Sequence, residues 1–140
     1  MSMFLIFAFF SIILSWLDIK YGEIPRAFSM FMLVCVIACQ IATSSIQFAG
    51  AIFAAVIFGF VYFATQKKMG LADIWYAIGA GFVLGIKLFI ISVLSACVTA
   101  GIFFAISHFA QKKGKTEKSI PFIPFLTIGY FFSLFCYYLA

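Results

Sequence analysis

Charged residues are scarce in this chain, and residues that bind metals are scarcer still. Only 9% of its 140 residues are charged, four of these are acidic, and His108 is the single histidine. Soluble domains carry about 25% charged residues, so an ordinary soluble domain is excluded. The four cysteines never form a C-x-x-C pair, and no other ligands cluster around His108 in the sequence. We therefore predict neither a metal site nor a disulfide framework.

Apolar residues make up most of what is present. They account for 66% of the sequence, aromatic residues account for 21%, and the mean hydropathy is +1.23. A helix needs roughly 20 apolar residues to cross the hydrocarbon core of a bilayer. The sequence therefore predicts an all-α, polytopic membrane protein with about six transmembrane helices, forming a single domain over residues 1–140. The predicted helices cover residues 3–17, 27–45, 49–65, 71–86, 88–110 and 120–139.

Basic residues are spread unevenly among the short connections between these helices. Lys20 and Arg26 follow the first helix, Lys67 and Lys68 the third, and Lys112, Lys113, Lys115 and Lys118 the fifth, whereas Lys87 alone follows the fourth. Lysine and arginine near helix ends are retained in the cytoplasm, so we expect these three connections to be cytoplasmic and both termini to lie outside. The same residues favour contact with anionic membrane lipid. Because they are scattered among short loops, they do not predict binding of nucleic acid.

Two aspartates lie at helix ends that this topology places on the same face. Asp18 closes the first predicted helix, and Asp73 opens the fourth. Carboxylates that come within a few ångströms cannot both ionise freely, and such a pair can activate water and protonate a leaving group. Two simpler explanations stay open. Asp73 near a helix N-terminus suits a cap, and Asp18 could pair with Lys20 or Arg26.

The sequence around both aspartates resembles that of the type IV prepilin peptidases. Residues 18–25, Asp-Ile-Lys-Tyr-Gly-Glu-Ile-Pro, are similar to the family's D-x6-P segment, and residues 70–73, Gly-Leu-Ala-Asp, are similar to its G-x-G-D. Small residues then follow at Gly79 and Gly85, as in the helix that continues from that motif. Residues 120–126, Ile-Pro-Phe-Ile-Pro-Phe-Leu, resemble I-P-F-G-P-F-L. The four segments occur in the family's order and span nearly the whole chain.

This resemblance implies an aspartic endopeptidase of the intramembrane type that needs no metal or other cofactor. Asp18 and Asp73 would be its catalytic residues. The implied substrate is a prepilin or pseudopilin of a type IV pilus or protein secretion system, cut at the cytoplasmic face of the bacterial inner membrane. Supporting motif residues would be Lys20, Pro25, Gly70, Ala72, Pro121 and Pro124. The chain lacks the zinc insertion linked to methyltransferase activity in larger relatives, and it resembles the small stand-alone peptidases of tight-adherence systems.

Several positions differ from the family's motifs. Ala72 stands where the second glycine of G-x-G-D is found, Arg26 replaces the asparagine of I-P-N, and Ile123 replaces the glycine before the second P-F. A second hypothesis therefore stays open, in which the fold serves as a non-catalytic membrane subunit of pilus or secretion assembly, or as a small transporter. The sequence carries no signal for an oligomeric state.

Small residues recur every four positions on two of the predicted helices. The repeats are Ala51, Ala55 and Gly59 on the third helix and Ala77, Gly81 and Gly85 on the fourth. Such spacing allows helix backbones to approach closely, so we expect these two helices to pack tightly against their neighbours.

Overall fold

Five helices make up the computed structural model, which describes residues 2–22, 24–43, 47–66, 69–110 and 121–140. They are α1 (Ser2–Tyr21), α2 (Arg26–Thr43), α3 (Phe48–Ala64), α4 (Leu71–Ala110) and α5 (Ile123–Leu139). No strand occurs within these ranges, so the all-α prediction is confirmed. The predicted ends at residues 45 and 120 and the lysines at positions 67, 68, 112, 113, 115 and 118 lie outside the described residues.

Helix α4 covers two of the predicted helices, 71–86 and 88–110, without an intervening loop. The separation between them takes the form of a sharp bend at Gly85, whose φ of 68° and ψ of 176° are not helical. A positive φ is readily adopted by glycine because it has no Cβ. A helix break leaves carbonyl groups without their usual partners, and the Gln40 side-chain amide of α2 donates a hydrogen bond to the Phe82 carbonyl just before the bend. The sequence thus predicted two helical stretches, and the backbone joins them through one glycine.

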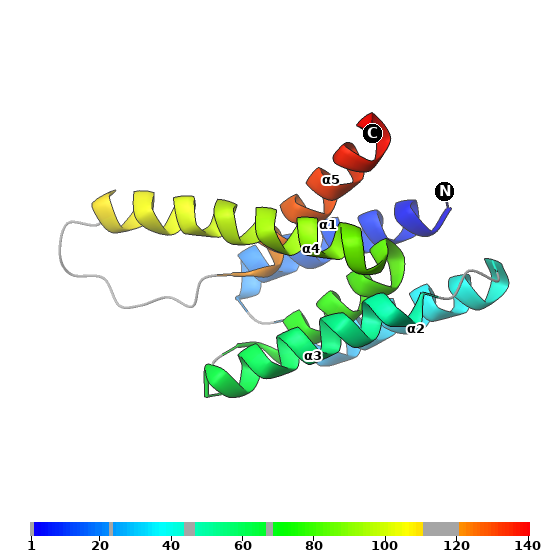
Figure 1. Cartoon of the computed structure of the whole chain (residues 1–140). Helices are drawn as coiled ribbons and strands as arrows, with labels where there is room; N and C mark the ends of the chain where they lie inside the picture. Colours follow the sequence, from blue (N-terminus) through cyan, green and yellow to red (C-terminus); the bar gives the residue numbers. More distant parts are fainter. Residues whose placement is uncertain (1, 23, 44–46, 67–68, 111–120) are drawn as a thin grey trace.

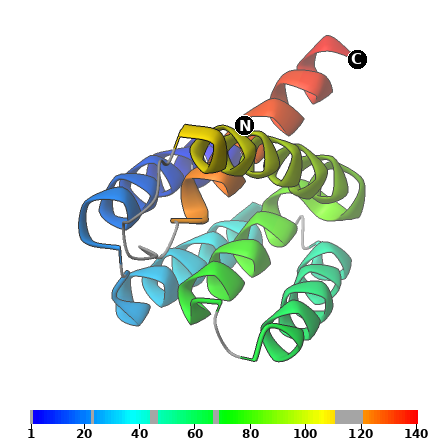
Figure 2. The ribbon, with the colours of Figure 1, turned by 90° about the vertical axis from the view of Figure 1, so that its left-hand side faces the viewer.

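The chain runs back and forth across the molecule (Figure 1). In this view the end of α1, the end of α3 and the end of α4 lie toward the left, whereas the end of α2, the bend at Gly85 and both termini lie toward the right. Figure 2 separates the two parts of α4, of which the part before Gly85 lies beside α2 and α3, and the part after it lies beside α5. The starts of α4 and α5 thereby come to the same end of the bundle as the end of α1.

Close backbone contact joins α3 to α4. A Cβ added to Gly50 would lie against the Gly81 carbonyl oxygen and 2.8 Å from the Gly85 Cα atom. The prediction of close packing is therefore confirmed for Gly81 and Gly85. It is wrong for Gly59, where an added Cβ would meet nothing within 4 Å.

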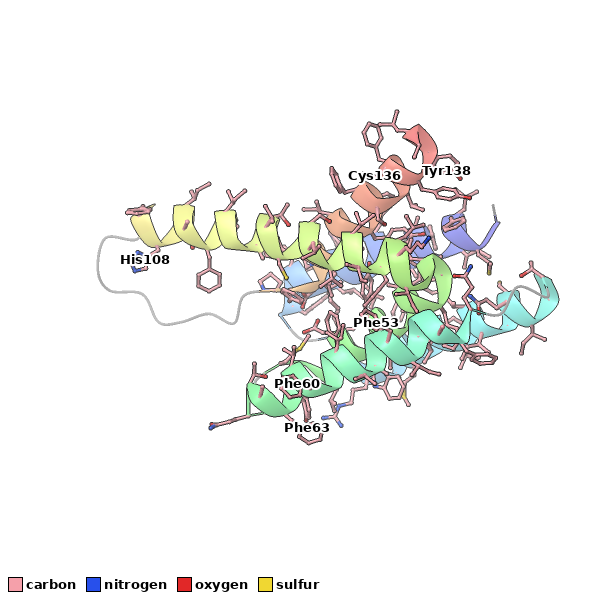
Figure 3. The ribbon with its side chains drawn as sticks, viewed as in Figure 1. Phe53, Phe60, Phe63, His108, Cys136 and Tyr138 are labelled. Atoms are coloured by element: carbon pink, nitrogen blue, oxygen red, sulfur yellow. The ribbon has the colours of Figure 1, made fainter. Side chains whose placement is uncertain are left out.

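The outer surface of the helices is apolar. Phe60 and Phe63 of α3 are 75% and 73% exposed and point away from the bundle (Figure 3). Soluble monomers rarely expose contiguous apolar surface on this scale. Within the described part of the chain, three helical segments, Met3–Tyr21, Arg26–Thr43 and Leu71–Phe109, are long and apolar enough to cross a membrane, while α3 and α5 are shorter apolar helices. These features are those of a membrane protein.

Candidate active site

Asp18 lies in the last turn of α1, where Gly22 ends the helix. Gly22 has a φ of +69°, and its N–H donates a 2.9 Å hydrogen bond to the Asp18 carbonyl. A left-handed glycine is a common end to a helix, so this segment of the D-x6-P motif fixes where α1 stops. The Asp18 side chain is only 8% exposed and therefore faces the interior of the bundle.

The first turn of α5 supplies the partner of the Asp18 carboxylate. The Ile123 backbone N–H donates to Asp18 Oδ2 at 3.2 Å. Ile123 is the first residue of α5 and Pro124 is the second, as expected for a proline in the opening turn of a helix. The N–H groups of a first turn lack partners within the helix and attract negative charge, so Asp18 satisfies one of them and lies where the α5 dipole favours an anion.

The predicted alternative partners of Asp18 lie elsewhere. Lys20 is exposed, and its Nζ lies over the rings of Trp16 and Tyr21, 4.6 Å and 5.2 Å from their centroids. Arg26 is exposed at the start of α2. Among the residues that the structure describes, no salt bridge reaches Asp18, so the sequence-based alternative of an ion pair is replaced by the bond to α5.

Asp73 is the third residue of α4 and comes close to Asp18 at the same end of the bundle. The two carboxylates are near enough to interact electrostatically, and the Asp73 side chain also accepts a hydrogen bond from the Gly70 backbone N–H. This contact between the third residue of a helix and the residue preceding the helix is one half of a capping box. A Cβ added to Gly70 would lie 3.5 Å from Asp73 Oδ2, so the carboxylate folds back over Gly70. The predicted cap is therefore present, alongside the approach to Asp18.

Ala72 takes an ordinary helical conformation beside Asp73. Helix α4 begins one residue earlier, at Leu71, and Ala72 is 9% exposed within the apolar core. Among the described residues other than glycine, a positive φ occurs at Gln66 and not at Ala72. Alanine in place of the motif's second glycine therefore fits the backbone without strain.

The remaining motif residues flank the site. Pro25 is exposed just before α2, and its carbonyl accepts a 2.9 Å hydrogen bond from the Phe28 N–H in the first turn of that helix. Pro121 is half-buried ahead of α5. Of the described residues that were predicted to support the motif, Gly70 is the one that bonds an aspartate directly.

A hydroxyl cluster lies beneath the two aspartates, and sequence reasoning missed it. It consists of the buried Ser11, Tyr76 and Thr127 and the half-buried Ser15. The Tyr76 hydroxyl donates to Ser11 Oγ at 2.9 Å and lies 3.2 Å from Thr127 Oγ1. Thr127 Oγ1 is also 2.7 Å from Ser15 Oγ and donates to the Ile123 carbonyl at 3.0 Å. Tyr76 is 1% exposed and Ser11 is fully buried. The cluster thus joins α1, α4 and α5 in the interior.

Helical spacing is the signal that could have revealed this cluster. Ser11 and Ser15 lie seven and three residues before Asp18, and Tyr76 lies three residues after Asp73. Residues three, four and seven positions apart share one face of a helix, so each aspartate belongs to a polar stripe on an otherwise apolar helix. Reading the stripe from each aspartate would have identified three of the four hydroxyl groups.

His108 lies far along α4, near the end of that helix, and is exposed (Figure 3). Across the described ranges, no group of three or more histidine, cysteine, aspartate or glutamate side chains is placed to hold a metal ion. The polar chemistry of the described site consists of two carboxylates, the backbone N–H groups that bond them and the hydroxyl cluster.

Comparison with known families gives this site a context. The sequence pattern of the type IV leader peptidase family matches residues 5–105, well over half of the chain. The chain belongs to the type IV leader peptidase family. The resemblance drawn from the motifs is thereby confirmed, and membership implies a peptidase. Neither a curated protein nor a solved structure matches the chain.

The matched region of the chain contains both aspartates but not all of their partners. Asp18, Gly70 and Asp73 lie within residues 5–105, as do the hydroxyl groups of Ser11, Ser15 and Tyr76. Helix α5, which provides the Ile123 N–H and the Thr127 hydroxyl, lies beyond the match. The structure thus adds to the family resemblance a third helix, which contacts the Asp18 carboxylate.

Proposed function

We propose that this protein is a membrane aspartic endopeptidase that removes the leader peptide of type IV prepilins or pseudopilins. The observation that carries the proposal is the convergence of Asp18 and Asp73, which come from helices far apart in the sequence and lie close enough to interact electrostatically. Each carboxylate is oriented by one backbone N–H, that of Ile123 or that of Gly70. Membership in a leader peptidase family supports this reaction class.

The proposed reaction is hydrolysis of a peptide bond by the two carboxyl groups. One carboxylate accepts a proton from a water molecule, and the water oxygen attacks the carbonyl carbon of the scissile bond. The other carboxyl group donates its proton to the departing amine nitrogen, and the carbon–nitrogen bond breaks. The Ile123 and Gly70 N–H groups are part of the protein backbone, so they hold the two carboxylates in place both before and after the substrate binds. The pair works as a unit whose proton is shared, and no metal is required.

We also propose that the site faces the cytoplasm of a bacterium whose inner membrane holds the protein, with six crossings and both termini outside. The back-and-forth course of the chain supports this arrangement, because it brings the ends of α1 and α3 to one side and the Gly85 bend to the other (Figure 1). Lys20 and Arg26 lie at the site's end, and Lys87 lies beside the bend. The basic leader of a prepilin stays in the cytoplasm, so its junction with the apolar helix reaches this end of the bundle.

One observation favours a second candidate, a non-catalytic subunit of pilus or secretion assembly that keeps the peptidase fold. Each aspartate makes a contact at a helix start that a structural role alone would explain. Asp73 caps α4, and Asp18 bonds the first turn of α5. Caps of this kind stabilise a helix by about 1 kcal/mol without any chemistry. The test must therefore separate capping from catalysis.

Substitution of either aspartate by asparagine makes this separation. Asparagine keeps an oxygen that accepts a hydrogen bond from the Ile123 or Gly70 N–H, but it cannot exchange the catalytic proton. In membranes that contain a prepilin with a basic leader, we expect the unmodified protein to release the leader and Asp18→Asn or Asp73→Asn to lower the cleavage rate at least about a hundredfold. Glu117→Gln is the control for loss of a carboxylate elsewhere in the chain.

Two outcomes would overturn the peptidase proposal. The first is full cleavage by Asp18→Asn or Asp73→Asn, and the second is an absence of cleavage by the unmodified protein toward every prepilin of its host. The second outcome would favour the assembly subunit.

A further inference from the structure

We propose that Thr127 is a positioning residue for the two aspartates, acting with Tyr76 through the hydroxyl cluster that joins α1, α4 and α5. This inference rests on the proposed peptidase function and adds to it a part of the chain, α5, that lies beyond residues 5–105. The claim is that the cluster sets the rotation of α1 and α4 about their axes. Those rotations decide whether the Asp18 and Asp73 carboxylates face each other.

The first step of the argument is the limited direct contact between the helices that carry the aspartates. Helices α1 and α4 meet along a short stretch. Helix α5 packs on α1 and on the part of α4 after Gly85, and it reaches the part that carries Asp73 through the 3.2 Å contact between Thr127 Oγ1 and the Tyr76 hydroxyl. The hydrogen bond from the Tyr76 hydroxyl to Ser11 Oγ, 2.9 Å long, links α1 and α4 directly. The orientation of one aspartate relative to the other therefore depends strongly on this region and on α5.

The second step is the central place of Thr127. Its hydroxyl lies 2.7 Å from Ser15 Oγ of α1 and 3.2 Å from the Tyr76 hydroxyl of α4, and it also contacts the Ser11 carbonyl at 3.4 Å. Thr127 further donates to the carbonyl of Ile123, the residue whose N–H bonds Asp18. One side chain thus connects both aspartate-bearing helices to the turn that holds the Asp18 carboxylate.

The third step is the register of these contacts with the carboxylates. Ser15 lies three residues before Asp18, Tyr76 lies three residues after Asp73, and Thr127 lies four residues after Ile123. Each hydroxyl therefore sits about one turn below the corresponding group of the candidate site, on the same face of the same helix. A rotation of any of the three helices would displace its hydroxyl and its upper group together.

The fourth step explains why hydroxyl groups are suited to this task. Lipid tails are as apolar as leucine side chains, so apolar packing alone specifies the rotation of a membrane helix weakly. A buried hydroxyl that loses its partner carries a desolvation cost, which makes its direction specific. Thr127 is 6% exposed and Tyr76 is 1% exposed, so water does not readily replace a lost partner for either.

The test compares Thr127→Val with Thr127→Ser and a matched control, using the full-length protein and a prepilin in liposomes. Valine keeps the shape of threonine without its hydroxyl, and serine keeps the hydroxyl. Thr99→Val is the control, because among the described residues the Thr99 hydroxyl bonds just the Ser95 and Ala96 carbonyls of its own helix. We expect Thr127→Val to lower kcat roughly tenfold, the rate equivalent of one lost buried hydrogen bond, with KM changed less than twofold. Thr127→Ser should restore kcat, and Thr99→Val should leave it unchanged.

A second variant tests the hydroxyl cluster at another residue, and a second readout measures the spacing of the two aspartate positions without any cleavage reaction. Tyr76→Phe removes the direct link between α1 and α4 and should lower kcat in the same way. In a chain whose four cysteines are replaced by alanine, Asp18→Cys and Asp73→Cys report the spacing of the two positions through thiol crosslinkers of short and long spacer. We expect Thr127→Val to reduce crosslinking by the short reagent relative to the long one.

The outcomes separate this inference from the proposed function. If the unmodified protein cleaves prepilin and both aspartate variants do not, unchanged kcat in Thr127→Val and Tyr76→Phe overturns the positioning role alone. A tenfold loss in Thr127→Val that Thr127→Ser does not restore also overturns it. If the unmodified protein cleaves nothing, crosslinking still decides, because an unchanged ratio of short to long products contradicts positioning by Thr127.

Discussion

Asp18 lies between the carboxyl end of one helix and the amino end of another. The dipole of α1 disfavours an anion at this position, whereas the dipole of α5 and the Ile123 N–H, 3.2 Å from Oδ2, favour one. Lys20 does not compensate the charge, since it lies over Trp16. The position of α5 therefore decides whether a buried carboxylate is tolerated at the end of α1.

Ala72 permits a prediction about the altered motif. Because Ala72 is the second residue of α4 and has helical backbone angles, Ala72→Gly should give no gain in cleavage. Glycine in a helix is less stable than alanine by roughly 0.5–1 kcal/mol, so the variant should unfold more readily. Thermal unfolding in detergent and the cleavage rate per folded protein measure the two effects.

Ala77→Gly serves as the comparison, because Ala77 is buried in the same helix but lies one turn beyond Asp73. Both variants should lose stability to a similar degree. A cleavage rate that rises severalfold in Ala72→Gly, and not in Ala77→Gly, would mean that the site needs a glycine backbone next to Asp73 after all.

The site could be predicted from sequence only where a residue type was unusual. Aspartates are rare in an apolar chain, so the sequence identifies Asp18 and Asp73 as candidate site residues. The distribution of basic residues predicts that both lie at the same side of the bundle. Serine, threonine and tyrosine are common in apolar helices, and the Ser15–Thr127 contact joins residues 112 positions apart. Such a contact depends on how two helices are rotated, which a single sequence does not reveal.

At the scale of the elements, the bend in α4 is the feature that organises the bundle. The sequence indicated two apolar stretches separated near Lys87, and the backbone changes direction at Gly85 without a loop. The position was missed because glycine occurs throughout these helices, and the Gln40 contact to the Phe82 carbonyl that accompanies the bend comes from a different helix. Helix existence follows from apolar length, whereas a bend depends on tertiary contacts.

Gly50 provides the prediction that belongs to this scale. A methyl group added there would meet the Gly81 carbonyl oxygen and approach the Gly85 Cα atom to 2.8 Å, so α3 and α4 would have to separate at the bend. Overpacking of this kind costs about 1–3 kcal/mol, and we expect Gly50→Ala to lower the free energy of unfolding by this amount. Denaturation of the purified protein in mixed micelles measures the change.

Gly59→Ala is the matched control on the same helix, because an added Cβ at position 59 meets nothing within 4 Å. The control should be neutral or stabilising by up to about 1 kcal/mol, since alanine favours a helix over glycine. Equal destabilisation by the two variants would contradict the close contact between α3 and α4.

At the scale of the whole molecule, charge and chain direction agree. The basic residues predict that the connections after α1 and α3 share one side and that Lys87 lies on the other. The ribbon places the ends of α1 and α3 opposite the bend at Gly85, two residues before Lys87 (Figure 1). The charge pattern contains no information about helix packing, and the packing contains none about lipid or cytoplasm. Their agreement is therefore informative about how the protein lies in a membrane.

The corresponding prediction concerns which side each connection faces. In a chain whose native cysteines are replaced by alanine, Lys87→Cys should react with a membrane-impermeant maleimide added outside spheroplasts, and Arg26→Cys should react only after permeabilisation. Both side chains are exposed, so access depends on the membrane and not on burial. Ser133→Cys, at a fully buried position of α5, should react in neither case. Labelling of both connections from one side would contradict the arrangement of the helices, whereas exchange of the two sides would contradict only the orientation read from the charges.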